Sequence, residues 1–181
     1  MSNDASTPND AALVDDAVVQ RVVAAGMERG ADFAELFVEE KRSSSALLDD
    51  GRVEELTSGR DRGAGIRVVA GDSTGFAHTS HPSEDGLLAA ARTAAAAARG
   101  AGSGATVVAL DPVDAPRPNG VRVLPADVPK ARKVELLLAA DEMARAEGAS
   151  ITQVAARYAD SRRRILVANS DGTLGGDDQV K

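Results

Sequence analysis

The side chains best suited to metal or acid–base chemistry are the only two histidines, His78 and His81, in the segment H-T-S-H-P. Histidines three residues apart share one face of a helix, but they do not converge from a strand, where side chains alternate. The alternating residues before this pair and Pro82 after it place the histidines at the end of a strand. Glu84 and Asp85 nearby are typical of the first turn of a following helix. Surface histidines are therefore the preferred interpretation, and a pair of metal ligands is the alternative.

The glycine-rich segment G-A-G-I-R-V-V-A-G does not match a phosphate-binding loop. A dinucleotide-binding motif needs Gly at its first, third and sixth places, and the sixth place counted from Gly63 is Val68. These glycines are better explained as interruptions within strands. The serines are not expected to supply a nucleophile. Because the chain has no Cys, disulfides, Cys-ligated zinc, Fe–S clusters and thiol nucleophiles are excluded.

Charged clusters are the remaining candidates for binding. The run R-R-R at residues 162–164 is interpreted as a solvated turn at a hairpin tip, with contact to an anionic partner as the alternative. The acidic pairs Asp49-Asp50, Glu54-Glu55 and Asp177-Asp178 are interpreted as turn or edge charges, which protect strand edges from aggregation. The sequence alone does not show whether any carboxylates converge for acid–base chemistry.

Composition excludes several classes of protein. The 181 residues carry a net charge of −7 and only 2% aromatic residues, so the chain is unsuited to general nucleic-acid binding. No apolar run approaches the ~20 residues that cross a bilayer. Residues 1–10 lack the basic start and apolar middle of a signal peptide. We therefore expect a cytoplasmic protein with a core of Val, Leu, Ile and Ala.

The predicted elements alternate between helices and hairpins. Valines at helical spacing predict a helix over residues 10–29, with Asp10 as its N-cap and Gly30 ending it. Residues 1–9 are expected to form a disordered tail. Turns at Asp50-Gly51 and Gly71-Asp72 predict two hairpins. The strands of these hairpins are expected at about 32–48, 52–61, 66–70 and 73–80.

The second half is predicted to contain two helices and a third hairpin. The helices begin at Pro82 and Pro129, reach about Arg99 and Gly148, and are separated by a proline- and glycine-rich connection over about 100–128. The third hairpin is expected to pair residues 151–160 with 164–168 across a charged turn at 160–163. The order predicts an α+β fold, with antiparallel β-ribbons or a curved sheet and about three packed α-helices.

Several segments, in this order, resemble the opening of the TldD/PmbA family. The first are A-D-F-A-E-L-F-V-E, L-L-D-D-G-R-V-E-E-L and G-A-G-I-R-V-V-A-G-D-S-T-G-F-A-H-T. The later ones are K-A-R-K-V-E-L-L-L-A-A-D and I-L-V-A-N-S-D-G-T-L-G-G-D. The resemblance covers about residues 11–180, and the ending S-D-G-T-L is more similar to the TldD branch than to PmbA.

The resemblance implies a cytosolic zinc metallopeptidase that acts on peptides and unfolded segments, in a family first described as modulators of DNA gyrase. The family pairs TldD-type and PmbA-type subunits, and the TldD-type subunit holds zinc through His-Glu-x-x-x-His and a later Cys. This sequence has no His-Glu pair and no Cys, so no catalytic, cofactor-binding or metal-ligating residue is assigned. Zinc is expected only in full-length members.

We therefore expect residues 10–181 to form a TldD/PmbA-like N-terminal domain, with the C-terminal metallopeptidase domain absent and the chain inactive alone. Its expected role is scaffold, substrate admission and subunit pairing, and the polar hairpin over 32–61 is the candidate edge for peptide. The alternative is a non-catalytic binding or regulatory module that assembles with a full-length TldD- or PmbA-type partner. Neither nucleic acid nor membrane is an expected partner. Apolar surface left exposed is expected to promote self-association.

Overall fold

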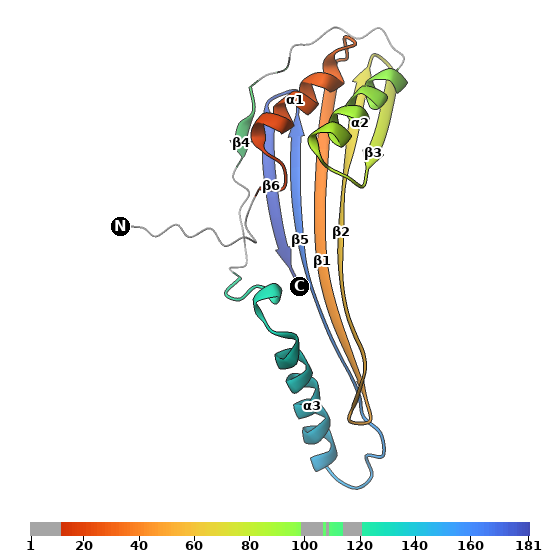
Figure 1. Cartoon of the computed structure of the whole chain (residues 1–181), viewed down its shortest axis with the longest axis vertical. Coiled ribbons are helices and arrows are strands. Elements are labelled where there is room, and N and C mark those ends of the chain that lie inside the picture. The colour runs from red at the N-terminus through yellow and green to blue at the C-terminus, as the bar shows by residue number, and fades with distance from the viewer. Residues whose placement is uncertain (1–11, 99–106, 108, 114–120) are drawn as a thin grey trace, which may run out of the picture. The chain divides into compact units, whose positions relative to one another are not determined.

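The computed structural model describes residues 12–98, 107, 109–113 and 121–181 (Figure 1). Within these ranges it has a six-stranded sheet and three α-helices, which confirms the α+β prediction. In chain order the elements are α1 (Asp16–Met27), β1 (Phe33–Asp49), β2 (Arg52–Ala70), β3 (Ser73–Thr79), α2 (Glu84–Ala97), β4 (Asp111–Val113), the 3-10 helix η1 (Pro125–Asp127), α3 (Lys130–Ala146), β5 (Ala155–Asn169) and β6 (Thr173–Val180). The predicted tail over 1–9 and Asp10 lie outside the described residues.

The chain divides into two compact units, each assembled from segments distant in sequence. The described parts of unit 1 lie within residues 1–40, 62–116 and 164–177. Those of unit 2 lie within residues 41–61, 117–163 and 178–181. Strands β1, β2 and β5 each contribute residues to both units.

The sheet has the strand order β3-β2-β1-β5-β6-β4. The predicted turn at Asp50-Gly51 joins β1 to β2, and both residues have positive φ, 49° and 75°, as a type I′ hairpin turn requires. The predicted turn at Gly71-Asp72 likewise joins β2 to β3, which are antiparallel. Strand β2 is continuous, however, where the sequence predicted two strands separated near Gly63. Glycines within it leave the strand unbroken because they accept extended backbone as readily as a turn.

The predicted third hairpin is wrong, because β5 passes without a turn through residues 160–163. The turn comes after Asn169, whose side-chain oxygen accepts hydrogen bonds from the backbone N–H groups of Asp171 and Thr173, at 3.1 and 3.0 Å. Gly172 has φ 96°, a conformation that favours glycine. Asp160 and Arg162 suggested a turn because they are charged, but within β5 they pair with Lys133 of α3 and with Asp178 near the end of β6.

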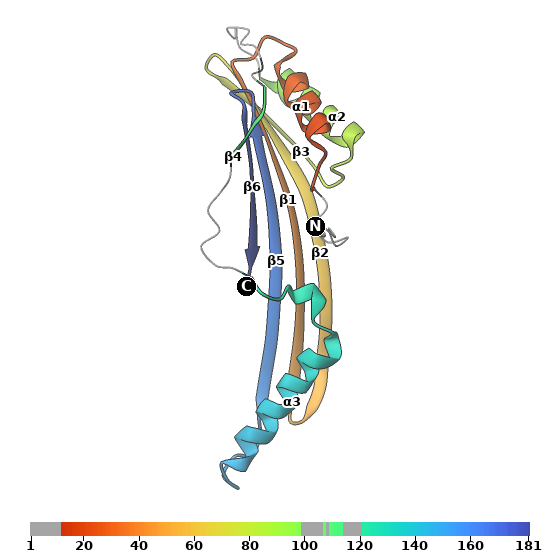
Figure 2. The ribbon, with the colours of Figure 1, turned by 90° about the vertical axis from the view of Figure 1, so that its left-hand side faces the viewer.

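In unit 1, α1 and α2 pack on one face of the sheet (Figure 2). Helix α1 begins after Asp15, whose carboxylate accepts a hydrogen bond from the N–H of Ala17 at 2.9 Å, so Asp15 is the N-cap and not Asp10. Gly30, with φ 78°, follows the helix as predicted. The core is aliphatic, as the composition predicted, and its fully buried larger side chains are Val19, Val22, Val23, Leu36, Val38, Ile66, Val68 and Leu87.

In unit 2, α3 lies along one face of the strands (Figure 2). The buried apolar cluster beneath it is small: Ala46, Leu48 and Leu137, with Ala156 and Tyr158 packed against it. A cluster of this size supplies limited hydrophobic stabilisation. Polar contacts therefore contribute a larger share of the interactions between α3 and the strands.

None of the helices in the described ranges combines the length and the apolar character that a membrane-spanning helix needs.

Candidate functional site

A buried ion pair lies between α3 and the strands of unit 2. Lys133 Nζ is 2.6 Å from Asp160 Oδ2, and the two side chains are only 6% and 8% exposed. Lys133 also donates to Ser44 Oγ at 2.8 Å, and Ser44 donates to Asp160 Oδ1 at 2.9 Å. Lys133 Nζ lies 5.5 Å from the centre of the Tyr158 ring. Each charge is thus paired and hydrogen-bonded, as burial requires.

The surroundings of this pair shift the acidity of two of its members. Burial raises the pKa of the Asp160 carboxyl, but hydrogen bonds from Lys133, Ser44 and Tyr158, together with the Lys133 charge, outweigh burial and hold that pKa below its ordinary value. Burial, and then the hydrogen bond to Asp160, raise the pKa of the Tyr158 hydroxyl. The cluster is therefore arranged to keep Asp160 ionised and Tyr158 neutral, which is a structural role for both.

These shifts predict how stability depends on pH. Because the pKa of Asp160 is lower folded than unfolded, its stabilisation is present above about pH 4 and is lost as the pH falls through the folded value. The raised pKa of Tyr158 adds stabilisation that is lost as the pH rises beyond about 10. Urea unfolding between about pH 2 and 7 should give a smaller acid slope for Asp160→Asn than for the unmodified chain. Equal slopes would contradict the assignment.

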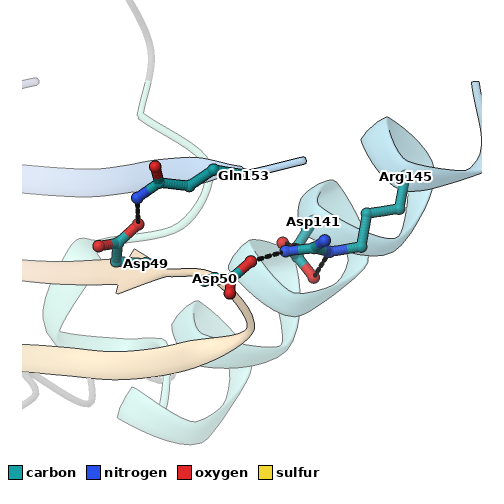
Figure 3. A network of polar contacts seen from close by, with 5 residues as sticks. All are labelled: Asp49, Asp50, Asp141, Arg145 and Gln153. Carbon is teal, nitrogen blue, oxygen red and sulfur yellow. Dashed lines mark hydrogen bonds and ion pairs between the residues drawn. The ribbon is translucent and has the colours of Figure 1, made fainter. Parts of the chain in front are cut away.

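A second polar network joins the C-terminal end of α3 to the β1–β2 turn (Figure 3). Arg145 contacts both Asp141 oxygens at 3.2 Å and also pairs with Asp50 of the turn. Gln153 donates to Asp49 at 2.9 Å. Because Arg145 is partly exposed, its ion pairs are expected to contribute little to the free energy of unfolding. Their main effect is to fix the position of α3 relative to the β1–β2 turn.

The residues singled out as possible metal ligands do not gather. His78 lies on β3, 6.4 Å from Phe76 between ring centres, and His81 Nδ1 hydrogen-bonds Ser80 at 3.0 Å in the loop before α2. Among the described residues, no three His, Asp or Glu side chains converge to hold a metal ion. The expectation that zinc is held only in full-length members of the family stays a prediction.

The segment G-D-S-T-G at residues 71–75 has the G-x-S-x-G spacing of a nucleophile elbow. An elbow requires a sharp turn from a strand into a helix. Here the segment is instead the hairpin turn between β2 and β3, and Ser73 begins a strand. The segment therefore lacks the strand-to-helix geometry of a nucleophile elbow.

The arginine run at residues 162–164 is not a solvated turn. Arg162 is 7% exposed within β5, and its Nε lies 2.9 Å from Asp178 Oδ1. The Arg162–Asp178 pair is two-pronged, since further contacts join Nε and Nη2 to Oδ2. Asp178, interpreted from the sequence as an edge charge, is instead the partner of a buried guanidinium. Glu54 and Glu55 are exposed on β2, as interpreted.

The candidate functional surface is the part of β2 that precedes its pairing with β3. Strand β3 pairs with β2 only from Ala64 onward, so residues 52–63 have β1 on one side and no described strand on the other. Every residue from 52 to 62 is exposed. A strand edge of this kind presents backbone donors and acceptors to another chain. This edge is therefore the candidate surface for an extended segment.

The described residues thus form an α+β fold in which β2 extends well beyond its pairing with β3. Residues 34–98 match the family domain described as PmbA/TldA metallopeptidase domain 1, and residues 124–181 match the PmbA/TldA metallopeptidase central domain. The chain belongs to the PmbA/TldD family of metallopeptidases and corresponds to its N-terminal part.

Relatives with curated names support this membership. The chain is 31% identical over 154 residues to "Metalloprotease TldD homolog" of Haemophilus influenzae, covering 82% of this chain and 31% of the relative. It is 36% identical over 152 residues to "Metalloprotease" of Methanothermobacter thermautotrophicus, covering 82% and 32%. The chain therefore spans about a third of the length of these relatives.

Solved structures show the same fold. TldE from Thermococcus kodakarensis superposes with a TM-score of 0.70 at 17% identity, over 90% of this chain and 37% of that one. A putative modulator of DNA gyrase from Thermotoga maritima gives a TM-score of 0.70 at 15% identity, over 91% and 37%. At these identities the likeness concerns the fold alone.

Proposed function

We propose that this chain serves as the N-terminal part of a TldD-like zinc metallopeptidase, in which it supplies scaffold, admits peptide substrate and pairs with a TldD- or PmbA-type subunit. The observation that carries the proposal is the free edge of β2 over residues 52–63. An extended peptide can add to such an edge as a further strand, with affinity from main-chain hydrogen bonds. The edge tolerates many sequences, as a peptidase acting on unfolded segments needs. Catalysis and zinc belong to the rest of the full-length relatives.

Backbone-modified peptides test this role directly. We expect an extended ten-residue peptide to bind the chain and to slow amide hydrogen exchange in residues 52–62. The same peptide with alternate backbone nitrogens methylated lacks the donors on one edge, so its binding should fall at least tenfold. Hydrogen exchange read by mass spectrometry measures both effects. Protection elsewhere with none in β2, or equal binding of the methylated peptide, would contradict the admission role.

Subunit pairing is supported by the outer side of α3. Leu136, Ala139, Ala140 and Met143 recur at i, i+3, i+4 and i+7 and are all exposed, with Met143 at 72%. Leu137, on the other side of the helix, is buried. An apolar stripe on an exposed helix is typical of an interaction surface.

The variant Met143→Glu tests this surface. We expect it to leave the free energy of unfolding, measured with urea, within about 0.5 kcal/mol of the original, because the side chain is exposed. We expect it to weaken association with a full-length TldD- or PmbA-type subunit at least tenfold, because a charge would enter an apolar contact. Analytical ultracentrifugation of mixtures measures this change. The exposed substitution Glu142→Gln on the same helix is the control and should leave association unchanged.

The alternative function, a non-catalytic regulatory module, predicts the same association with a different consequence. Titration of the chain into a full-length partner would then change the partner's peptidase rate without adding a peptide-binding edge. Zinc-dependent peptidase activity from residues 1–181 alone would contradict both functions.

A further inference from the structure

A polar hollow lies on the open face of the strands in unit 2. It has a volume of about 360 Å³ and is formed by β1, β2, β5 and the end of the chain. Its floor carries small hydroxyl side chains, among them Ser43, Ser45 and Thr57, and the Ser45 and Thr57 oxygens are 2.7 Å apart. Lys133 of α3 contacts Ser44, so α3 lies on the face of β1 to which Ser44 points. Side chains alternate along a strand, so Ser43 and Ser45 point to the opposite face, which α3 does not cover.

The charges around the hollow are predominantly positive, although the chain as a whole carries −7. Lys41, Arg157 and Lys181 line it. Asp160 carries the only side-chain carboxylate in the lining, and its charge is already balanced by Lys133. Within the described residues, neither Lys41 nor Arg157 forms an ion pair. The hollow is thus a local cationic site with hydroxyl donors, which is suited to an oxyanion.

We propose that this hollow binds a carboxylate of an acidic peptide segment, held by Lys41 and Arg157 and by hydrogen bonds from the floor hydroxyls. Its volume accommodates an Asp or Glu side chain with its flanking backbone. Nucleic acid is disfavoured, because the lining contains no aromatic side chain on which a base could stack. The proposal goes beyond the admission of peptide at the β2 edge, since that edge binds main chain without regard to sequence. The hollow would add a preference for acidic side chains.

Charge-matched variants of the 181-residue chain test the site. The double variant Lys41→Gln/Arg157→Gln removes the two cations that are proposed to hold the carboxylate. The control, Arg122→Gln/Lys130→Gln, removes the same charge from other exposed positions of unit 2. Fluorescence anisotropy should measure binding of a labelled ten-residue peptide with alternating Glu and Ala, and of its Gln and Lys counterparts. Competing inorganic phosphate and a single-stranded oligonucleotide complete the set.

We expect the hollow variant to bind the Glu peptide about fivefold more weakly than the unmodified chain, and the control to bind it within a factor of two, as two exposed charge pairs would contribute. The Gln peptide should bind all three proteins equally. Equal weakening in both variants, or equal binding of the Glu and Gln peptides, would overturn the proposal. So would binding of phosphate or oligonucleotide at the hollow without binding of the Glu peptide. If the peptide did not slow hydrogen exchange in residues 52–62 but the Glu peptide still bound more tightly than the Gln peptide, only the proposed admission of peptide at the β2 edge would be wrong.

Discussion

Asp160→Leu is expected to lower the free energy of unfolding of unit 2 by about 3–5 kcal/mol, because it leaves Lys133 charged, buried and without its carboxylate. The measurement is urea unfolding followed by circular dichroism. The small apolar cluster beneath α3 offers little to compensate. We expect α3 to detach, which would appear as faster hydrogen exchange over residues 130–146 than in the unmodified chain.

The double variant Lys133→Met/Asp160→Leu separates the cost of an unpaired charge from the worth of the pair. Replacing a buried ion pair with apolar side chains of similar size is often neutral or stabilising, so this variant should recover most of the lost stability. The control Arg132→Met breaks an exposed pair with Glu135 on the same helix and should cost no more than about 1 kcal/mol. A double variant as unstable as Asp160→Leu would show that the pair contributes more than mutual neutralisation.

Gly75→Ala is expected to destabilise unit 1 by about 3 kcal/mol. A Cβ at Gly75 would lie 2.0 Å from the carbonyl oxygen of Ala94 and 2.6 Å from the nitrogen of Ala98, both of them backbone atoms near the C-terminal end of α2. Backbone atoms cannot move aside as a side chain can, so α2 must shift away from β3 and open the core. Thermal unfolding should show a lower midpoint.

Gly175→Ala is the matched control. A Cβ at Gly175, in β6, would meet no atom within 4 Å, so the change adds only a methyl group and reduces the freedom of the unfolded chain. We expect stability equal to that of the original or slightly higher. If Gly75→Ala unfolded at the same temperature as Gly175→Ala, the close approach of β3 to α2 would be wrong.

The sequence was sufficient to predict elements whose signals are local. The Asp50-Gly51 turn is an example, because a type I′ turn depends on its own two residues. Helix α2 is another, since its alanine-rich run has high intrinsic propensity. The order of the predicted elements indicated the α+β fold, and the resemblance indicated the family; both predictions are confirmed.

The buried charges of unit 2 were missed because their partners are remote in sequence. Asp160 meets Lys133, 27 residues away, and Arg162 meets Asp178, 16 residues away. Read alone, four polar residues in a row suggest a turn. A signal was nevertheless present: Tyr158, Asp160 and Arg162 continue the strand alternation without a break. The pattern on α3 was also present, since Lys133, Leu137 and Asp141 are its buried residues at intervals of four.

The two ladders of strand β1 differ in the order in which we expect them to form. The β1–β2 ladder grows outward from a two-residue turn, so it closes on the microsecond timescale of hairpins. At the two ends of the β1–β5 pairing, backbone hydrogen bonds join Asp50 to Val154 and Ser170 to Ala34, residues far apart in sequence, so this pairing must wait for the intervening chain. During synthesis, β1 therefore emerges and pairs with β2 well before β5 is made. Until β5 arrives, the other side of β1 exposes unpaired backbone groups, and we expect this stage to be the one most prone to aggregation.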